Sequence, residues 1–441
     1  MTSPRASWTL DDWLAWLETL SPREIDLGLE RVVEVLERLA LARPPLVVHV
    51  AGTNGKGSCA AMLESILIED RRRVGCYTSP HVVHYNERIR VAGRAVDHAA
   101  IVAAFRTVES RRDGLPLTYF EYGTLAALVV FDAMAADALV LEIGLGGRLD
   151  AVNAVDPDGA IITNIALEHC DWLGDNVEAI AREKAGVMRA AKPVVFGAAT
   201  VPDSIVGEAG RIGADLWLCG RDFDYAADES GTGTGAGTWH WRGRDLAIDG
   251  LAPPSLRGTF QLQNAAAVLA LVESLQLARL LTREHVDTAF GRLEISGRLQ
   301  RVTTRREWLL DVAHNPDAAR VLGESLDRIR VGSTCPGGVT AVIGVLADKD
   351  LAGIVQPLLP HVDRWIAVTA GSPRALPARD VAQLIARLAD KPCLVAESIP
   401  ATMEYLEARA NQGELLLVTG SFFTVGPALA WLENPGNARS V

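Results

Sequence analysis

The chain has 441 residues, of which 49% are hydrophobic and 22% charged, and 43 Lys and Arg against 55 Asp and Glu give a formal net charge of −12. Its length suggests two or three domains, and its composition excludes disordered and fibrous proteins. The acidic balance argues against a nucleic-acid-binding protein, so an anionic ligand would need a local cluster of N–H groups, lysines or metal ions.

Two further features concern the cellular compartment. No apolar run approaches the ~20 residues that span a bilayer, and acidic residues and Trp occupy the amino terminus where a signal peptide would be apolar. The 6 cysteines are widely spaced without a CxxC motif, as expected for buried thiols in a reducing compartment. We therefore expect a soluble, cytoplasmic protein that binds no membrane.

Apolar segments of strand length alternate with helical patterns in the first two thirds of the chain. Helical spacing predicts an amphipathic helix over 29–39 and another over 58–68. Strands are predicted at 46–50, 74–78, 138–143, 160–165 and 193–196. Continuous apolar strands separated by helices predict a mostly parallel sheet that is covered on both faces.

The last third of the chain starts a second alternation of strands and helices. A segment rich in Gly and Thr at 228–250 predicts a surface hairpin or a short antiparallel excursion without chemistry of its own, and a helix is predicted at 264–275. New strands are then predicted at 308–312, 339–345, 365–368 and 415–418. We place a domain boundary near Ser296, which gives domains of residues 1–296 and 297–441.

A glycine-rich loop follows the strand at 46–50 and precedes a helix. Its residues are Gly52, Thr53, Asn54, Gly55, Lys56, Gly57 and Ser58. Glycines let backbone N–H groups turn towards a phosphate, the helix presents its positive end, and Lys56 can reach terminal phosphates. The loop departs from the GxxxxGK[ST] pattern, and the alternative is a simple turn with a surface lysine. The strand–loop–helix context favours phosphate binding.

A second glycine cluster, Gly144 to Gly147, also follows a strand. Leu149 occupies the third glycine position of a dinucleotide fingerprint, which disfavours a nicotinamide cofactor and a dehydrogenase. Glu142 stands at the carboxyl end of a strand, where ligands bind in open α/β sheets. Its carboxylate suits Mg²⁺, although an ion pair with Arg148 is an equally good interpretation.

Other polar residues follow further strands. His169 comes after the strand at 160–165, and Lys184 lies in a charged run that would by default be a solvated helix face. In the second domain, Asp311, His314 and Asn315 follow one strand and Ser421 follows another. These residues are ligand candidates, although turn and cap roles are common for Asp and Asn.

The motifs taken together resemble the Mur ligase superfamily and, within it, the bacterial folylpolyglutamate synthase/dihydrofolate synthase family. They occur in family order over nearly the whole chain: IDLGLERV (25–32), AGTNGKGS (51–58), TSPH (78–81), NERIRV (86–91), TYFEYGTLAAL (118–128), LEIGLGGRLDAVN (141–153), ALEHCDWLG (166–174), REKAGV (182–187), SGRLQ (296–300), DVAHNP (311–316), GVLADKD (344–350) and TGSFFTV (419–425). The resemblance implies a P-loop ATP-binding α/β domain with a mostly parallel sheet and a smaller C-terminal Rossmann-like α/β domain that receives glutamate.

The resemblance also implies a role for particular residues. Residues Thr53 to Ser58 would hold the ATP phosphates, with Asn264, Arg298 and Asp311 as further ATP contacts. Two Mg²⁺ ions would be bound, one by Ser79 and Glu142 and one by His169, and Lys184 matches the family lysine that becomes carbamylated. Arg88, His314 and Ser421 would position glutamate. Thr118, Tyr119, Phe120 and Glu121, together with Leu149, Asp150 and Ala151, match the pteroate pocket. Lys56, Lys184, His314 and Asp311 are the predicted catalytic residues.

The activity implied is ATP-dependent addition of L-glutamate to dihydropteroate and to reduced folates through an acyl phosphate. A monomer that acts on these small molecules is expected. The alternatives are a single-activity folylpolyglutamate synthase or dihydrofolate synthase, a Mur ligase that builds peptidoglycan, and a P-loop regulatory ATPase. The regulatory ATPase would leave the DVAHNP and TGSFF motifs without a role.

Overall fold

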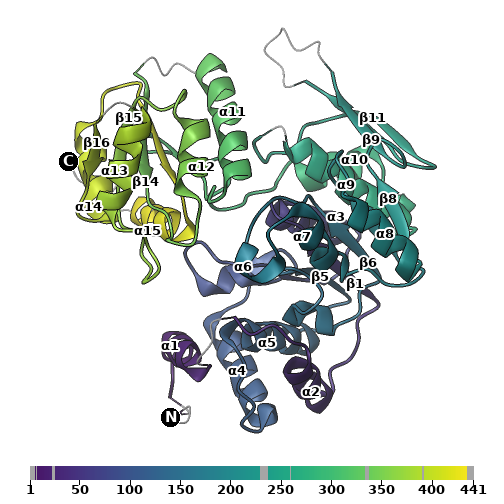
Figure 1. Ribbon diagram of the computed structural model, residues 1–441. Helices are drawn as coiled ribbons and strands as arrows, with labels where there is room; N and C mark the ends of the chain where they lie inside the picture. The colour runs from purple at the N-terminus through teal and green to yellow at the C-terminus, as the bar shows by residue number, and fades with distance from the viewer. Residues whose placement is uncertain are drawn as a thin grey trace. The chain divides into compact units, whose positions relative to one another are not determined.

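The computed structural model describes residues 5, 7–21, 25–228, 237–258, 260–332, 337–389 and 392–434. It divides into two compact units (Figure 1). The first comprises Met1–His81, Tyr85–Ser255 and Gln261–Leu293, and the second comprises Val82–His84, Leu256–Phe260 and Glu294–Val441. Two short segments from earlier in the chain, Val82–His84 and Leu256–Phe260, therefore belong to the second unit. A single boundary near Ser296 does not include them.

The first unit is built on an 8-stranded sheet of order β4-β3-β2-β5-β1-β6-β7-β8. Its strands are β1 (Leu46–Ala51), β2 (Val74–Tyr77), β3 (Ile89–Val91), β4 (Arg94–Ala95), β5 (Ala138–Glu142), β6 (Gly159–Ile162), β7 (Pro193–Phe196) and β8 (Asp215–Leu218). All neighbours are parallel except at the edge, where β3 pairs antiparallel with β2 and β4. The predicted mostly parallel sheet is confirmed.

Helices cover both faces of this sheet. One core cluster joins the strand residues of one face to α1 (Leu10–Leu20), α2 (Glu30–Leu39), α4 (His98–Arg112), α5 (Tyr119–Ala133), α7 (Val177–Ala185) and α8 (Asp203–Ile212). The opposite face packs against α3 (Lys56–Glu69) and α9 (Phe260–Ser274). The remaining helices are α6 (Cys170–Leu173) and α10 (Arg283–Phe290), with 3₁₀ turns η1 (Tyr85–Arg88), η2 (Ala151–Ala154) and η3 (Ala278–Leu280). Strand β1 lies between β5 and β6 and is buried throughout, so it fixes the loop that follows it.

The structure adds to the sequence prediction and corrects it in several places; strands β3, β4 and β8, for example, were not predicted. Helix α1 was not predicted, and it begins with a capping box between Thr9 and Asp12. The predicted antiparallel excursion is confirmed as a 3-stranded antiparallel sheet of β9 (Asp224–Ala227), β10 (Trp239–Arg242) and β11 (Ala247–Leu251). Residues 229–236, between β9 and β10, lie outside the described residues. Strand β6 ends at Ile162 instead of 165, because the residues after it bond to the glycine-rich loop.

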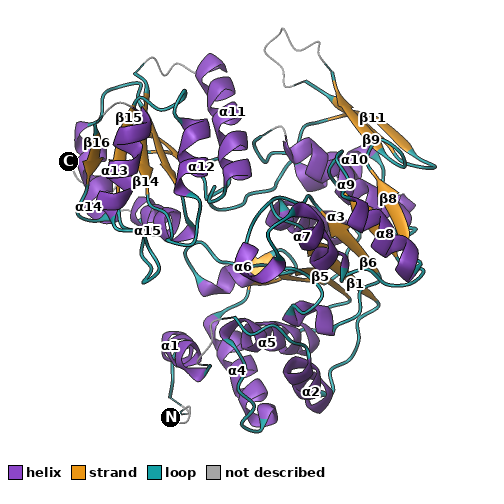
Figure 2. Ribbon diagram, in the orientation of Figure 1, coloured by secondary structure: helices purple, strands orange, loops and turns teal. Residues whose placement is uncertain are grey.

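The second unit has a 6-stranded sheet of order β12-β13-β17-β14-β15-β16. Its strands are β12 (Gln300–Thr303), β13 (Glu307–Leu310), β14 (Val339–Ile343), β15 (Arg364–Ala367), β16 (Cys393–Val395) and β17 (Leu415–Thr419). Only β12 pairs antiparallel among these described strands. One face packs on α11 (Pro316–Gly332), α12 (Leu351–Val355) and α13 (Ala378–Ala389), and the other on α14 (Ile399–Arg409) and α15 (Phe422–Glu433), as Figure 2 shows; a 3₁₀ turn, η4 (Gln356–Leu358), follows α12.

The α/β class predicted for both parts of the chain is thus confirmed. Among the helices that the structure describes, none combines the length and the apolar character needed to cross a membrane.

Candidate active site

The glycine-rich loop has a backbone that only glycine adopts readily at two positions. Gly52 has φ +132°, and a Cβ there would lie 1.9 Å from Thr163 Oγ1. Gly55 has φ +84° and closes directly against Asn264, whose Oδ1 would lie 2.8 Å from an added Cβ. These close approaches place the chain after β6 on one side of the loop and helix α9 on the other.

Hydrogen bonds fix the loop to the chain that follows β6. The amide of Thr53 donates to Asn164 O at 3.0 Å, and the amide of Asn54 donates to Asn164 Oδ1 at 2.9 Å. Thr163 Oγ1 donates to Asn54 O at 2.6 Å, and the amide of Ala166 donates to Thr53 Oγ1 at 3.0 Å. The loop is therefore held in shape before α3 begins at Lys56.

Helix α9 supports the other end of the loop through buried amides. Gln261 Nε2 donates to Ser58 Oγ at 3.3 Å, and Asn264 Nδ2 donates to Gln261 Oε1 at 3.0 Å. The predicted loop residue Ser58 and the predicted ATP contact Asn264 thus belong to one network. Gln261, which links them, was missed because a buried Gln in an apolar helix carries no sequence signal.

Two lysine ammonium groups meet at one carbonyl oxygen of the loop. Lys56 Nζ donates to Gly52 O at 3.1 Å and to Thr53 O at 3.0 Å. Lys184 Nζ donates to the same Gly52 O at 2.7 Å and pairs with Glu168 Oε1 at 3.0 Å. Lys184 is 2% exposed, so it is not on a solvated helix face.

The electrostatics of this cluster follow from burial. Burial lowers the pKa of Lys184 to about 8, with Glu168 opposing and Lys56 reinforcing the shift. Burial alone would raise the pKa of Glu168, but the Lys184 ammonium beside it brings that pKa down to about 2. Glu168 was missed as a site residue, because a partner 16 positions away leaves no local pattern.

Glu142 and Ser79 also lie together. The backbone amide of Ser79 donates to Glu142 Oε2 at 3.2 Å, and that same oxygen lies 3.8 Å from a Cβ built on Gly57. Glu142 is buried at the carboxyl end of β5, beside the start of α3. Arg148, the partner in the alternative interpretation of Glu142, forms an ion pair with Glu183 at 2.9 Å.

These residues can be tested as a Mg²⁺ site by their donor chemistry. A buried carboxylate next to a serine provides the oxygen donors that Mg²⁺ prefers, with substrate phosphate and water completing the shell. Among the described residues, no group of three or more His, Cys, Asp and Glu side chains could hold a metal ion by itself. The Ser79–Glu142 pair therefore fits an ion shared with a phosphate ligand. The nitrogen donor of His169, which lies in left-handed conformation at the start of α6, suits Mg²⁺ less well than an oxygen ligand.

The second glycine cluster packs against the helix that carries Lys184. A Cβ on Gly147 would lie 2.8 Å from Glu183 O and 2.9 Å from Lys184 O, and a Cβ on Gly186 would lie 2.4 Å from Arg148 Cβ. Asn153 Nδ2 donates to Arg148 O and to Gly186 O, both at 3.1 Å. The absence of side chains at Gly147 and Gly186 thus lets the two backbones touch.

Asp150, which the sequence predicts to contact substrate, shapes this loop instead of pointing outwards. Its carboxylate accepts from Leu145 N at 2.8 Å and from Val152 N at 3.0 Å. Burial raises the pKa of Asp150 to about 7, although these backbone donors oppose the shift. Its neighbours Leu149 and Ala151 are half-buried and buried respectively.

The predicted pteroate residues at the start of α5 fall into two groups. Thr118 and Glu121 form a buried capping box, and Arg31 NH2 pairs with Glu121 Oε1 at 2.9 Å. Tyr119 and Phe120 are half-buried. The second pair is the more exposed, and the first pair caps the helix that carries it.

Arg88 lies beside the aromatic residues of this region. Its guanidinium carbon is 5.4 Å from the centre of the Tyr85 ring and 5.6 Å from that of Tyr119, and its Nε donates to His81 Nδ1 at 2.8 Å. Arg88 is 9% exposed. A cation held over aromatic rings suits an anionic, planar ligand.

In the second unit, four predicted residues gather at the carboxyl ends of β13 and β17, which are parallel neighbours. Asp311 accepts from Leu299 N and Ala313 N, both at 2.9 Å, and burial raises its pKa although Arg298 opposes the shift. Arg298 lies over the Phe422 ring, 5.5 Å from its centre, and the His314 ring packs against the same ring at a tilt of 54°. Ser421 Oγ accepts from Phe423 N at 3.1 Å and begins α15. Arg88 lies in the first unit, whereas His314 and Ser421 lie in the second. Their shared assignment to glutamate therefore stays a prediction.

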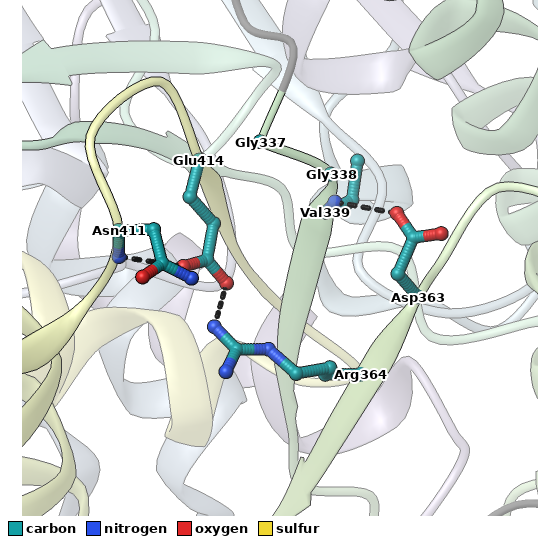
Figure 3. A pocket seen from close by; sticks show the side chains of 7 residues that line it. All are labelled: Gly337, Gly338, Val339, Asp363, Arg364, Asn411 and Glu414. Atoms are coloured by element: carbon teal, nitrogen blue, oxygen red, sulfur yellow. Dashed lines mark hydrogen bonds and ion pairs between the residues drawn. The ribbon is translucent and has the colours of Figure 1, made fainter.

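One pocket of about 400 Å³ lies at the opposite, amino end of the same sheet (Figure 3). Its charged groups are already paired: Arg364 NH2 contacts Glu414 Oε1, and Asp363 Oδ2 accepts from Val339 N at 2.8 Å. It contains none of the predicted site residues. We interpret its paired residues as structural, because they join the amino ends of neighbouring strands.

Comparisons with known proteins place this site in a class. Residues 50–272 match the Mur ligase middle domain, and residues 297–422 match the glutamate ligase domain of Mur ligases. With the loop–helix geometry of the first unit and the strand ends of the second, these matches define an enzyme of the Mur ligase class.

Individual relatives narrow the class. The dihydrofolate synthase/folylpolyglutamate synthase of Escherichia coli strain K12 is 39% identical over 434 residues, which cover 98% of this chain and 97% of the relative. The structure of E. coli FolC in complex with DHPP and ADP is similar with a TM-score of 0.88 and 38% identity, over 97% of this chain and 98% of that one. A Yersinia pestis bifunctional folylpolyglutamate synthase/dihydrofolate synthase complexed with AMPPNP and Mn ion has a TM-score of 0.87 and 38% identity, over 98% of this chain and 100% of that one. The chain belongs to the dihydrofolate synthase/folylpolyglutamate synthase family of ligases.

Proposed function

We propose that the chain transfers the γ-phosphoryl group of ATP to the carboxylate of dihydropteroate or of a reduced folate and then joins that acid to the amine of L-glutamate. The observation that carries this proposal is the pair of ammonium groups, Lys56 and Lys184, that share the carbonyl oxygen of Gly52. Two like charges at one oxygen repel each other, and an anion bound at the loop relieves that repulsion.

Polyphosphate is the anion that the surroundings fit. The amides at the start of α3 and its positive end face the same loop, and Asn264 lies against Gly55. A phosphoryl transfer asks the protein mainly to position the groups and to neutralise charge. Lys56 is the group of this loop that supplies a mobile positive charge, because its present acceptors are only two backbone carbonyls.

We assign one Mg²⁺ ion to Ser79 and Glu142 and a second to His169. When bound, such ions neutralise the charge that develops on the transferred phosphoryl group. The relative complexed with AMPPNP and Mn ion supports the use of a nucleotide and a divalent metal. Mn²⁺ also accepts imidazole nitrogen more readily than Mg²⁺ does.

Carbamylation of Lys184 is part of the proposal. Its lowered pKa leaves a substantial fraction of neutral amine, which is the form that reacts with CO₂ and loses one proton to give a carbamate. The product would replace the ammonium beside Glu168 with a second carboxylate, so the pair would then need a cation next to it. The modification and the second metal ion therefore support each other.

The remaining residues are assigned to the other substrates. Arg298 and Asp311 contact ATP, and Arg88, His314 and Ser421 position glutamate. Tyr119 and Phe120, with Leu149, line the site for the pteroate ring, while Thr118, Glu121, Asp150 and Ala151 hold the backbone that presents them. The chain would act as a monomer in the cytoplasm.

The chemistry needs two steps, because a carboxylate is a poor electrophile. Attack of the carboxylate oxygen on the γ-phosphorus forms an acyl phosphate and releases ADP. The glutamate amine then attacks the acyl carbon, and the tetrahedral intermediate expels phosphate to leave an amide. His314 lies at a strand end with its Nδ1 next to Val312 O, so its other ring nitrogen is the group we assign to the amine.

The proposal is tested by glutamate-dependent phosphate release from ATP, measured separately with dihydropteroate and with tetrahydrofolate. Release with both acids supports a bifunctional enzyme, as the names of the relatives describe. Release with one acid alone would indicate the single-activity alternative. Release that does not depend on glutamate would favour the regulatory ATPase. Membership of the ligase family argues against that alternative.

A further inference from the structure

An arginine outside every assigned role makes five contacts in the interior of the first unit. Arg90, in β3, donates from Nε to Glu64 Oε2 at 2.8 Å and from NH2 to Cys76 Sγ at 3.1 Å. Its NH1 donates to Thr78 Oγ1 at 3.3 Å and to Glu87 O at 3.2 Å, and NH2 also lies 2.7 Å from Glu64 Oε2. One guanidinium thus connects α3, β2, β3 and η1.

The residues that Arg90 holds stand at the two ends of one loop. Thr78 precedes Ser79, which we assign to Mg²⁺, and Glu87 precedes Arg88, which we assign to glutamate. The ends are joined directly by Thr78 N, which donates to Arg88 O at 2.9 Å, and by Thr78 Oγ1, which donates to Glu87 O at 3.4 Å. NH1 of Arg90 contacts both Thr78 and Glu87, one at each end of the loop. The position of the guanidinium therefore sets the distance between the two loop ends.

The other side of the guanidinium fixes this closure to the helix that starts at the glycine-rich loop. Glu64 lies in α3, two turns beyond Lys56, and is 4% exposed. Glu64 Oε2 pairs with the guanidinium at 2.7 Å, and breaking a buried ion pair is costly, so Glu64 holds Arg90 in one orientation. The planar fork of arginine then presents separate N–H groups to opposite sides, which the single ammonium of lysine cannot do.

We propose that Arg90 is a positioning residue for the ligase reaction: it holds Thr78 and Glu87, and through them Ser79 and Arg88, in fixed register with helix α3 behind the phosphate loop. The proposal rests on the proposed function for what Ser79 and Arg88 do. The arrangement of Arg90 itself rests only on the contacts above.

Arg90→Lys separates positioning from charge balance, since lysine keeps a cation next to Glu64 but loses the NH1 contacts. We expect the half-saturating Mg²⁺ concentration and the KM for glutamate each to rise about tenfold. The KM for ATP stays within about twofold, because Thr163, Asn164 and Ala166 hold the phosphate loop without Arg90. Arg72→Lys is the matched control, since Arg72 pairs with Asp70 at 2.9 Å, away from this loop.

A second readout needs no activity. Hydrogen exchange of peptides covering 78–88 should be about tenfold faster in Arg90→Lys while β1 peptides exchange as in the wild type. Thr78→Val removes one acceptor of NH1 together with the direct Thr78 Oγ1–Glu87 O bond, and it keeps the ion pair with Glu64. It should change exchange in the same direction and serves if Arg90→Lys does not fold.

Two outcomes overturn the proposal. One is an unchanged Mg²⁺ and glutamate dependence with unchanged exchange of 78–88. The other is a fall in kcat alone that follows a loss of thermal stability, which a merely structural arginine would give. If the wild type shows no glutamate-dependent turnover, the proposed function fails, and the exchange measurement alone decides the role of Arg90.

Discussion

The buried pair of Lys184 and Glu168 offers a sharp test, because removal of one partner separates stability from catalysis. In the unmodified chain, where Lys184 carries an ammonium, Lys184→Met removes the cation that lies 3.0 Å from Glu168, whose side chain is 8% exposed in the wild type. Lys184 lowers the pKa of Glu168 from the ordinary 4.5 to about 2. This shift corresponds to a contribution of about 3 kcal/mol to the free energy of unfolding at neutral pH. Breaking a buried pair typically costs ~3–5 kcal/mol, so we expect a destabilisation of about 3 kcal/mol.

A double variant isolates the catalytic part. Lys184→Met combined with Glu168→Leu removes both charges, and apolar replacement of a buried pair is often neutral for stability. We expect the double variant to regain most of the lost stability but to remain at least about a hundredfold slower than the wild type, since a charge that stabilises phosphoryl transfer is worth ~3 kcal/mol.

Stability is measured by urea unfolding, with hydrogen exchange of first-unit peptides as the probe. Turnover is measured as glutamate-dependent phosphate release at saturating substrate concentrations. Recovery of turnover in the double variant would refute the reasoning, because it would mean that Lys184 serves only to balance Glu168. Normal turnover in Lys184→Met would refute it as well.

Three further predictions concern single residues. Lys56→Ala should keep the circular dichroism spectrum and lose about a hundredfold or more in turnover, because the loop loses its mobile cation. His169→Ala should raise the Mg²⁺ concentration needed for half-maximal activity, measured by titration of phosphate release. Burial, reinforced by Arg189, lowers the pKa of His49 to about 3, whereas the unfolded chain binds that proton below about pH 6.5. The stability tied to neutral His49 is therefore complete above pH 6.5 and falls by about 2 kcal/mol at pH 5; hydrogen exchange of β1 at both pH values measures it, and His49→Gln should lack that part of the pH dependence.

Matched controls sharpen these tests. Lys192→Ala removes a lysine that pairs with Asp158 at 3.1 Å outside the loop, and it should leave turnover unchanged. His98→Gln replaces an exposed histidine and is the matched control for His49→Gln. An unchanged Mg²⁺ titration in His169→Ala would contradict the assignment of the second ion.

The sequence predicted those parts of the fold whose signal is local. The strand–loop–helix unit around Lys56 has an apolar run, glycines and a helical pattern in direct succession, so β1 and α3 fall within a few residues of the predicted ranges. The capping box of Thr118 and Glu121 is also a local pattern, and it would have identified the start of the helix that they cap.

Contacts between distant segments could not be predicted in this way. The ion pair of Lys184 with Glu168 joins residues on separate segments, and the backbone contact of Gly147 with Glu183 and Lys184 depends on how two loops meet. Arg90 lies in the NERIRV motif, but its contacts with α3, β2, Thr78 and η1 arise only in the folded chain. Strand β6 ends early because Thr163 to Ala166 bond to the glycine-rich loop, which is a tertiary effect.

The central claim is that the acid is activated as an acyl phosphate, and isotope transfer tests it most directly. Dihydropteroate carrying ¹⁸O in both carboxylate oxygens is incubated with ATP, Mg²⁺ and L-glutamate, and the released phosphate is analysed by mass spectrometry. The proposed chemistry transfers one ¹⁸O atom to phosphate in each turnover and leaves the other in the amide. Unlabelled phosphate accompanying amide formation would contradict it.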